Sequence, residues 1–234
     1  TMEPANSFVT LINQLRMISK GSSAVGAYRN SVPNKLFIKG RLNRAAGFDV
    51  AIEQPQGLFA SVLGDRLRQG GIAIDGQILQ KYVKHEDGLR VLTSFETPLA
   101  EVLARCNKDS LGLAAESLIK TISAENTQGR INGEWPHGLT LAGRYLQSLG
   151  IDSGQFVLDD GSGLSRNNRL SARALVTVLR DMYTSDSRDL YLDTLAVGGV
   201  DGTISRYFRQ TPYKGHIVGK TGYINGVRTF SGIC

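Results

Sequence analysis

Apolar residues recur with a helical period at the beginning of the chain. In "NSFVTLINQLRMISKG" they return every three or four positions, and Gly21 follows as a stop signal. The pattern predicts an N-terminal amphipathic helix whose apolar face consists of Phe8, Leu11, Ile12, Leu15 and Ile18.

Shorter patterns follow up to about residue 90. "NKLFIKGRL" and "FDVAIEQ" alternate like half-buried strands, and "IAIDGQILQKYV" reads as a strand pair around Asp75 and Gly76. Between them, "PQGLFASVLGDRLRQGG" predicts a helix that ends at Gly70. Its predicted inward face comprises Leu58, Phe59, Val62, Leu63 and Leu67. This part of the chain is therefore expected to be a small α+β region.

Longer helices are predicted from Thr93 onward. Thr97 and Pro98 begin a helix that runs towards Asn107, and a second helix begins at or near Ser110. A third helix ends at Gly150, a fourth starts at Ser171, and the turn "YING" joins two closing strands. We therefore expect a boundary near residues 90–95, with one region at 1–92 and another at 93–234.

Composition is that of a globular protein. The chain has 234 residues, of which 41% are hydrophobic and 21% charged. No apolar run approaches the length of a transmembrane helix, and the first residues do not resemble a secretory signal. The net charge of +6 suits an anionic partner. However, the basic residues are scattered, without the aromatic interleaving typical of nucleic-acid binding, so a solvated basic surface is the simpler interpretation.

Cysteine and histidine spacing gives no sign of a metal site. Cys106 and Cys234 lack C-x-x-C spacing, and His85, His137 and His216 are widely dispersed. Whether the two cysteines pair stays open. Trp135 is interpreted as a core anchor, and Asp160 and Ser162 as turn residues before the helix at Ser171.

Candidate chemistry lies in "GHIVGKTGYING", near the end of the chain. Lys220, Thr221 and Gly222 lie at the end of a predicted hairpin strand. A lysine ammonium and a threonine hydroxyl suit a peptide carboxylate, and glycine allows a substrate backbone to lie along the strand. The next N–H, that of Tyr223, can then serve as half of an oxyanion hole. An exposed strand end without function is the alternative for the tripeptide alone.

Three further stretches accompany this tripeptide in a fixed order: "NKDSLGLAAESLIK", "DDGSGLSRNNRLSARAL" and "VGGVDGTISRYF". Together the four closely resemble class C low-molecular-mass penicillin-binding proteins, the bacterial D-alanyl-D-alanine carboxypeptidase/endopeptidases of the DacB type. The resemblance is strong from Thr93 to the end and looser before it. It implies an α/β penicillin-binding serine transferase fold, with helices on an antiparallel sheet. It also implies that residues 1–92 are an accessory region inserted into that domain.

The resemblance implies an acyl-enzyme mechanism on peptidoglycan stem peptides outside the cytoplasm, with β-lactams as further ligands and no metal or organic cofactor. The family uses a nucleophilic serine in S-x-x-K, a second serine in S-x-N, and K-T-G. Ser110 matches the second serine and Lys220 the K-T-G lysine, so both are assigned catalytic roles. Thr221, Gly222 and Tyr223 are expected to bind substrate.

Two departures from the family pattern are visible. Gly112 stands where the family has the Asn of S-x-N, and neither Asn107 nor Asn168 can be assigned to replace it from sequence. Nothing before Ser110 fits S-x-x-K, and Ser117 to Lys120, the only such string, is interpreted as a coincidence inside a helix. We therefore expect a fragment that lacks its nucleophile and its C-terminal end.

Two other functions compete with the carboxypeptidase. A non-catalytic relative would bind wall peptide or a partner, and the two departures are compatible with it. A β-lactamase shares the K-T-G chemistry, but the first 90 residues and "DGSGLSR" argue against that class.

Overall fold

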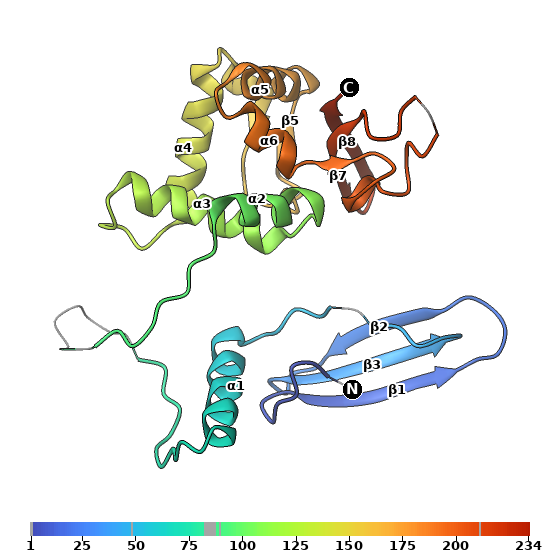
Figure 1. The fold of residues 1–234 in the computed structure, drawn as a ribbon, viewed down its shortest axis with the longest axis vertical. Helices are drawn as coiled ribbons and strands as arrows, with labels where there is room; N and C mark the ends of the chain where they lie inside the picture. The colour runs from blue at the N-terminus through green and yellow to red at the C-terminus, as the bar shows by residue number, and fades with distance from the viewer. Residues whose placement is uncertain (1, 48, 82–87, 89, 211) are drawn as a thin grey trace. The chain divides into compact units, whose positions relative to one another are not determined.

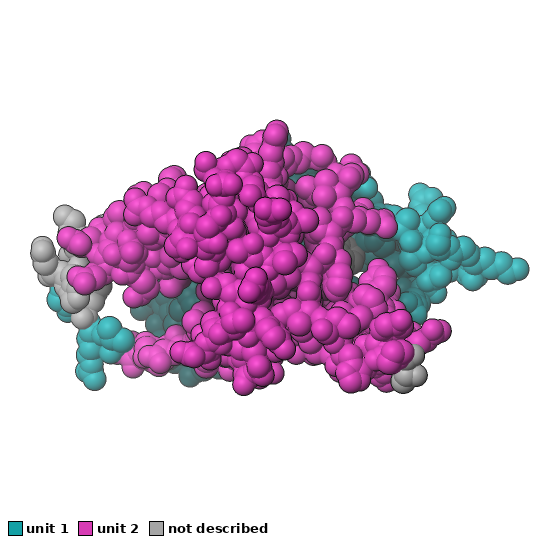
Figure 2. Space-filling view, turned by 90° about the horizontal axis from the view of Figure 1, so that it is seen from above, with its two compact units in different colours: residues 1–91 teal, residues 92–234 magenta. Residues whose placement is uncertain are grey.

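A computed structural model describes residues 2–47, 49–81, 88, 90–210 and 212–234. The chain divides into two compact units, Thr1–Val91 and Leu92–Cys234, which are distinguished by colour in Figure 2. Both contain helices and antiparallel strand pairs, so the predicted mixed α/β class is confirmed (Figure 1). That the first unit is an inserted accessory region stays a prediction.

The first unit contains a three-stranded sheet with the order β1-β3-β2 (Figure 1). Strand β3 (Lys35–Leu42) pairs in parallel with β1 (Thr10–Met17) and antiparallel with β2 (Ala24–Arg29). One face of the sheet is buried, with Leu36 and Ile38 packed beside Val9 in the core.

The predicted N-terminal helix is wrong, because this segment is strand β1. Leu11 and Leu15 also fit a period of two, and the parallel register places them beside Leu36 and Gly40 of β3. Pairing with a distant strand therefore outweighs the local helical period. The strand predicted from "FDVAIEQ" is also wrong for residues 49–54, although Val50 and Ile52 still pack against the core.

Helix α1 (Pro55–Gln69) confirms the prediction for that segment, and the chain leaves the helix at Gly70. Its predicted inward face is only partly correct. Leu58 packs against the core, whereas the residues Phe59 and Leu63 are 70% and 46% exposed. Residues 72–81 form no strand, and the rest of the predicted pair around Asp75 falls partly on residues 82–87, outside the described residues.

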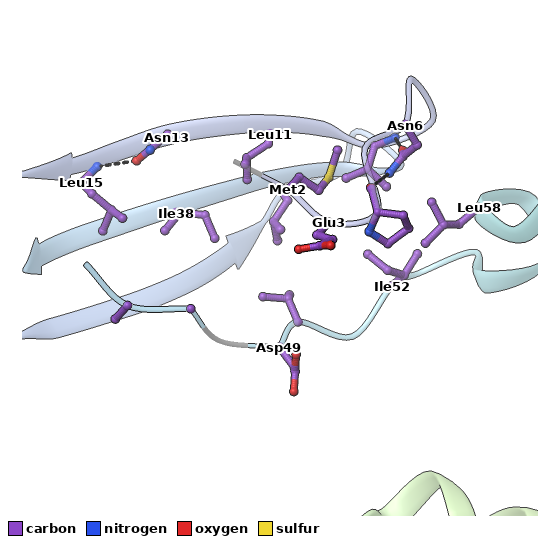
Figure 3. A pocket seen from close by; sticks show the side chains of 16 residues that line it. Met2, Glu3, Asn6, Leu11, Asn13, Leu15, Ile38, Asp49, Ile52 and Leu58 are labelled. Atoms are coloured by element: carbon purple, nitrogen blue, oxygen red, sulfur yellow. Dashed lines mark hydrogen bonds between the residues drawn. The ribbon is translucent and has the colours of Figure 1, made fainter. Parts of the chain in front are cut away.

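A cavity of about 400 Å³ lies between the buried face of the sheet and the segments that cover it (Figure 3). Leu11, Leu15 and Ile38 line it from the sheet, and Ile52 and Leu58 line it from the covering chain. The core of this unit is therefore incompletely filled. The cavity belongs to the first unit alone and contains none of the predicted site residues.

The second unit contains five α-helices in its described residues. They are α2 (Leu99–Lys108), α3 (Gly112–Asn126), α4 (Trp135–Ser148), α5 (Ala172–Thr184) and α6 (Arg188–Thr194). The predicted start at Ser171 is confirmed, because its hydroxyl caps α5 by accepting the Ala174 N–H at 3.0 Å. Short strands β4 (Phe156–Val157) and β5 (Arg169–Leu170) pair between α4 and α5.

A second three-stranded sheet closes the chain, in the order β6-β7-β8. Strand β7 (Val218–Ile224) pairs antiparallel with both β6 (Ala196–Val197) and β8 (Val227–Ile233). Gly226 has a φ of 87° in the turn between β7 and β8, which explains the glycine there and confirms the predicted hairpin. Among the residues described, no helix is long and apolar enough to cross a bilayer.

Candidate functional site

Ser110 lies in the turn between α2 and α3, two residues before α3 begins. Its φ of 58° is left-handed, a conformation that costs about 1 kcal/mol or more for a residue other than glycine. The N–H of Leu111 donates to the Arg105 carbonyl at 3.2 Å and closes the turn. The hydroxyl of Ser110 is therefore presented from an exposed, fixed turn, and the helix begins slightly later than predicted.

Polar contacts from α2 hold this turn in place. The Asn107 amide donates to the Thr194 hydroxyl at 2.9 Å, and the Lys108 ammonium meets the Asp201 carboxylate at 2.6 Å. Asp201 in turn accepts the Val197 N–H at 2.7 Å. The end of α2 is thus fastened to α6 and to the segment that follows β6.

The side chain of Lys220 contacts the side chain of Ser110 in this turn. Its ammonium lies 2.5 Å from the Ser110 hydroxyl oxygen and 2.6 Å from the Thr221 carbonyl oxygen. Burial lowers the pKa of Lys220, and the nearby Cys106 opposes this shift. Burial likewise raises the pKa of the Cys106 thiol. The structure therefore brings together the two residues to which the family resemblance assigns catalytic roles.

One backbone edge of β7 is uncovered beside these residues. Strand β6 pairs only with Val218 and Gly219, and no other described strand continues along this edge from residue 220 to 224. The opposite edge is paired with β8 along its whole length. A peptide can therefore add to β7 as a further strand on the β6 side.

Along a β-strand the backbone N–H and C=O groups of successive residues point to opposite edges, and this alternation indicates which of them face the uncovered edge of β7. The Ile217 carbonyl accepts the Gly198 N–H at 2.8 Å, so Ile217 directs its backbone groups towards the β6 side. Every second residue of an antiparallel strand does the same, which includes Thr221 and Tyr223. The Tyr223 N–H is thereby directed to the free edge, and its side chain is 69% exposed.

The other two residues of the tripeptide have close contacts of their own. The Thr221 hydroxyl donates to the Thr203 hydroxyl at 2.9 Å, and Thr203 lies in the short 3-10 helix Gly202–Ile204. A side chain at Gly222 would place its Cβ 2.3 Å from the Thr229 hydroxyl oxygen on β8. The facing threonine, in this rotamer, leaves no room for a side chain at this position. The sequence analysis identified neither Thr203 nor Thr229. The only indication of Thr203 was that it lies in "VGGVDGTISRYF", one of the four stretches that occur in a fixed order.

The loop of residues 159–168 packs against the start of α3. The Glu116 carboxylate accepts the N–H groups of Gly161 and Ser162, both at 3.0 Å, and the Trp135 indole N–H at 2.8 Å. Burial alone would raise the pKa of Glu116, but hydrogen bonds from Ser162, Gly161 and Trp135 outweigh it and lower the pKa. Trp135 is 46% exposed, so its interpretation as a core anchor is wrong.

Asp160 organises the loop from within. Its carboxylate accepts the N–H groups of Gly163 and Ser165, both at 2.6 Å, and the Asn168 amide at 2.7 Å. These bonds outweigh burial and lower the pKa of Asp160. Arg166 extends from the same loop and donates to the Asn225 carbonyl at 3.2 Å, which ties the loop to the β7–β8 hairpin. The contacts are those of a structured turn, which is the role predicted for Asp160.

Gly112 lies directly beneath this loop. An added Cβ would lie 3.3 Å from the Ser162 Cβ, which is a tight contact. The two amides considered as substitutes for the missing Asn have other partners, Asn107 on Thr194 and Asn168 on Asp160. Neither of these two amides is therefore placed to replace the one that Gly112 lacks.

The string from Ser117 to Lys120 lies within α3, as expected. The Lys120 ammonium lies 4.0 Å from the centroid of the Trp135 ring, a cation–π contact. Both cysteines are free thiols. Within the described ranges, no group of three or more His, Cys, Asp or Glu side chains is placed to hold a metal ion.

Comparison with protein families gives a match over almost the whole chain. The D-Ala-D-Ala carboxypeptidase 3 (S13) family matches residues 6–234. Among curated proteins, the chain is 29% identical over 204 residues to the D-alanyl-D-alanine carboxypeptidase DacB of Haemophilus influenzae. It is 30% identical over 188 residues to the D-alanyl-D-alanine carboxypeptidase of Actinomadura sp. strain R39. These alignments cover 85% and 77% of this chain, but only 42% and 34% of the relatives.

Solved structures show the same likeness. Two structures of penicillin-binding protein 4 from Haemophilus influenzae match with TM-scores of 0.75 and 0.76 and identities of 24% and 25%. They cover 96% and 98% of this chain, and the chain spans about half of theirs, 50% and 54%. In the second structure the Haemophilus protein is complexed with a β-lactam. The fold of the chain is therefore that of a known penicillin-binding protein over these residues.

Proposed function

Because the chain belongs to the D-Ala-D-Ala carboxypeptidase 3 (S13) family, we propose that it forms part of a serine-type D-alanyl-D-alanine carboxypeptidase or endopeptidase site. The substrate class is the peptidoglycan stem peptide, and the compartment is the periplasm or another extracytoplasmic part of the cell envelope. The names of the two curated relatives support the activity. The observation that carries the proposal is the 2.5 Å contact between Lys220 and Ser110, two residues 110 positions apart in the chain.

In this proposal the uncovered edge of β7 holds the substrate. The C-terminal carboxylate of the peptide accepts hydrogen bonds from the Lys220 ammonium and the Thr221 hydroxyl, and both contacts are charge-assisted. The Thr221 proton turns from Thr203 to the carboxylate for this, and the Thr203 hydroxyl then donates to Thr221. Gly222 lets the peptide backbone approach as an added strand. The Tyr223 N–H donates to the carbonyl oxygen as negative charge develops on it.

The chemical step is an acyl transfer. A serine oxygen attacks the carbonyl carbon of the penultimate D-alanine, and the C–N bond to the last D-alanine breaks. The serine gives up its proton as it attacks, and the leaving amine takes up a proton through Ser110 and Lys220. Water then adds to the ester carbonyl, the C–O bond to the serine breaks, and a proton from water restores the serine hydroxyl. The lowered pKa of Lys220 suits proton transfer, because it brings the ammonium closer to neutrality. We assign the nucleophile to no residue of this chain.

A non-catalytic wall-peptide binder is the second candidate. Gly112 and the engaged amides of Asn107 and Asn168 favour it, because a backbone contact to substrate is then missing. Such a protein would keep the carboxylate contacts of Lys220 and Thr221 but form no acyl-enzyme. β-Lactams, which mimic the acylating peptide, discriminate between the two candidates.

The experiment combines covalent labelling with binding. The full-length protein, with the segment that supplies the nucleophilic serine, is treated with fluorescent penicillin, and binding of a D-Ala-D-Ala peptide is measured by calorimetry. A stable covalent label that is lost in Lys220→Ala supports the carboxypeptidase, and rapid turnover of the label identifies a β-lactamase. Peptide binding without a label supports the second candidate. Neither label nor binding in a folded protein contradicts both.

A further inference from the structure

Positive charge is concentrated in the sheet of the first unit. Between Pro4 and Gly47 the chain has seven Lys and Arg residues and no Asp or Glu. They are Arg16, Lys20, Arg29, Lys35, Lys39, Arg41 and Arg44. A segment this long with one sign of charge produces a positive potential that attracts polyanions.

The strand register gathers four of these cations on one side of the sheet. Leu36, Ile38 and Leu42 of β3 are buried, so the alternating residues of β3 face outward. Arg16 of β1 is paired with Arg41, and Tyr28 of β2 with Phe37, which places them on the same outward side. We call this surface the cationic face; it consists of Arg16, Tyr28, Lys35, Phe37, Lys39 and Arg41.

The cationic face has no anionic partner within the described residues. None of the ion pairs found there involves one of its cations. Instead, the ammonium groups of Lys35 and Lys39 lie 5.5 and 5.8 Å from the centroid of the Phe37 ring. Arg16 and Arg41 are like charges in direct register on two parallel strands, so they repel each other. An anionic ligand would remove this repulsion.

We propose that the cationic face binds the carboxylate-bearing glycopeptide polymer of the cell wall. Guanidinium groups of Arg16 and Arg41 suit carboxylates, which they can bind in a bidentate manner. Tyr28, which is 55% exposed, offers a ring on which the apolar side of a sugar can stack. The choice of a glycan rests on the proposed function, because D-alanyl stem peptides are carried by such a polymer.

Two other polyanions match parts of the same pattern. Single-stranded nucleic acid uses cations with stacking aromatics. An anionic membrane uses cations, and peripheral attachment adds apolar side chains that enter the interface. The central strand of the cationic face presents an aromatic ring flanked by ammonium groups, and Ala24 and Gly26 of β2 add no large apolar side chain. Ile12 of β1, in register with Phe37, is the one large aliphatic side chain among these paired positions, which is little for insertion into a membrane interface. A glycan held by the first unit would raise the local concentration of stem peptides for the second unit.

The test is co-sedimentation of the full chain with purified, protein-free peptidoglycan sacculi. A fourfold variant removes the charge of the cationic face by Arg16→Gln, Lys35→Gln, Lys39→Gln and Arg41→Gln. The matched control removes four exposed cations of the second unit by Arg144→Gln, Arg173→Gln, Arg180→Gln and Lys214→Gln. We expect release of the wild-type chain at high salt. At low salt we expect about tenfold or greater loss of affinity in the variant and less than about twofold in the control.

Several results would overturn the proposal. These are equal binding by wild type and variant, equal losses in variant and control, or binding to anionic vesicles or oligo-dT without binding to sacculi. Circular dichroism monitors folding, and the single variants Lys39→Gln and Tyr28→Ala supply the test if the fourfold variant does not fold. Sacculus binding and penicillin labelling are both measured for Ser110→Ala. The two readouts distinguish a failure of this binding proposal from a failure of the proposed enzymatic activity.

Discussion

The two units place their charged side chains differently. Residues 1–91 have 12 Lys and Arg against 7 Asp and Glu, whereas residues 92–234 have 15 against 14. In the second unit, carboxylates such as Glu116 and Asp160 accept several hydrogen bonds from one loop. In the first unit, the four cations of the cationic face point outward without a carboxylate partner in the described residues.

This difference separates two uses of polar groups. A site that moves protons needs its hydroxyl and amine groups held in one geometry, and the partners of α2 and of the 159–168 loop provide that for Ser110 and Lys220. A surface that attracts a polymer needs free charge more than fixed geometry. We therefore expect substitutions in the second unit to change chemistry and stability, and those on the cationic face to change affinity.

The largest effect is expected from Lys220→Ala. This change removes the partner of Ser110 and the cation proposed for the substrate carboxylate. Loss of a proton-transfer group typically costs about 100-fold or more in rate. In the full-length protein that contains the nucleophilic serine, we expect at least that decrease in the rate of penicillin acylation, measured by gel fluorescence. Lys214→Ala, on an exposed lysine of the same unit, is the control and should leave the rate unchanged.

Lys220 also predicts the pH dependence of peptide binding. Burial lowers its pKa below the ordinary value of 10.5, so the ammonium loses its proton at a lower pH than a free lysine does. Binding of a peptide carboxylate should therefore weaken as the pH rises towards 10.5, and the Lys220→Ala protein should lack this decrease. A wild-type profile that stays flat up to pH 10.5 would contradict the role of Lys220.

Gly222→Ala is expected to have the next largest effect. The new Cβ would lie 2.3 Å from the Thr229 hydroxyl oxygen, so either the Thr229 side chain leaves its rotamer or β7 and β8 move apart. Overpacking of this kind costs about 1–3 kcal/mol, measurable by urea denaturation. Thr229→Ala removes the hydroxyl, and the Cβ of residue 229 lies 3.7 Å from the new Cβ at residue 222. The double variant Gly222→Ala/Thr229→Ala should therefore recover most of the loss. Additive losses would show that Thr229 is not the cause.

Part of the structure of the two units could be predicted from the sequence. The hairpin at Asn225 and Gly226 and the cap at Ser171 depend on residues close in the chain, and both predictions are confirmed. The N-terminal segment was assigned wrongly, because Leu11 and Leu15 fit both periods and only parallel pairing with β3 decides between them. The local hydrophobic periodicity of a segment contains no information about its pairing with a strand about 25 residues away.

The candidate site shows the same limit of prediction from sequence. The order of motifs predicted that Ser110 and Lys220 belong together, and the structure places them in contact. Thr203 and Thr229 were not identified, because each acts through one contact across the fold and neither lies in a distinctive tripeptide. The cationic face was also missed: its residues are scattered in the sequence and are gathered only by strand alternation.

Glu116→Ala tests whether the second unit depends on its internal carboxylates. The change leaves the N–H groups of Gly161, Ser162 and Trp135 without their acceptor. We expect a loss of about 1–2 kcal/mol in the free energy of unfolding. Glu125→Ala, at an exposed position of the same helix, is the control. An equal effect of both substitutions would contradict the role of Glu116.

The same carboxylate gives a stability change with pH. Its pKa is lowered in the folded state, so the ionised form stabilises the fold above the ordinary value of 4.5. This contribution is lost as the pH falls from about 4.5 through the lowered pKa. The difference in stability between wild type and Glu116→Ala should therefore shrink in that range, as thermal denaturation at several pH values would reveal.

The smallest effect is expected from Thr203→Val, which keeps the shape of the side chain and removes its hydroxyl. Thr221 then loses its 2.9 Å partner and can rotate, while Lys220 and Ser110 keep their contact. A neutral hydrogen bond of this kind contributes about 0.5–1.5 kcal/mol, or a few-fold in peptide affinity. Calorimetry should show weaker peptide binding, whereas the acylation rate at saturating penicillin stays close to that of the wild type. A loss in the acylation rate as large as that of Lys220→Ala would mean that Thr203 supports the proton path and not the carboxylate contact alone.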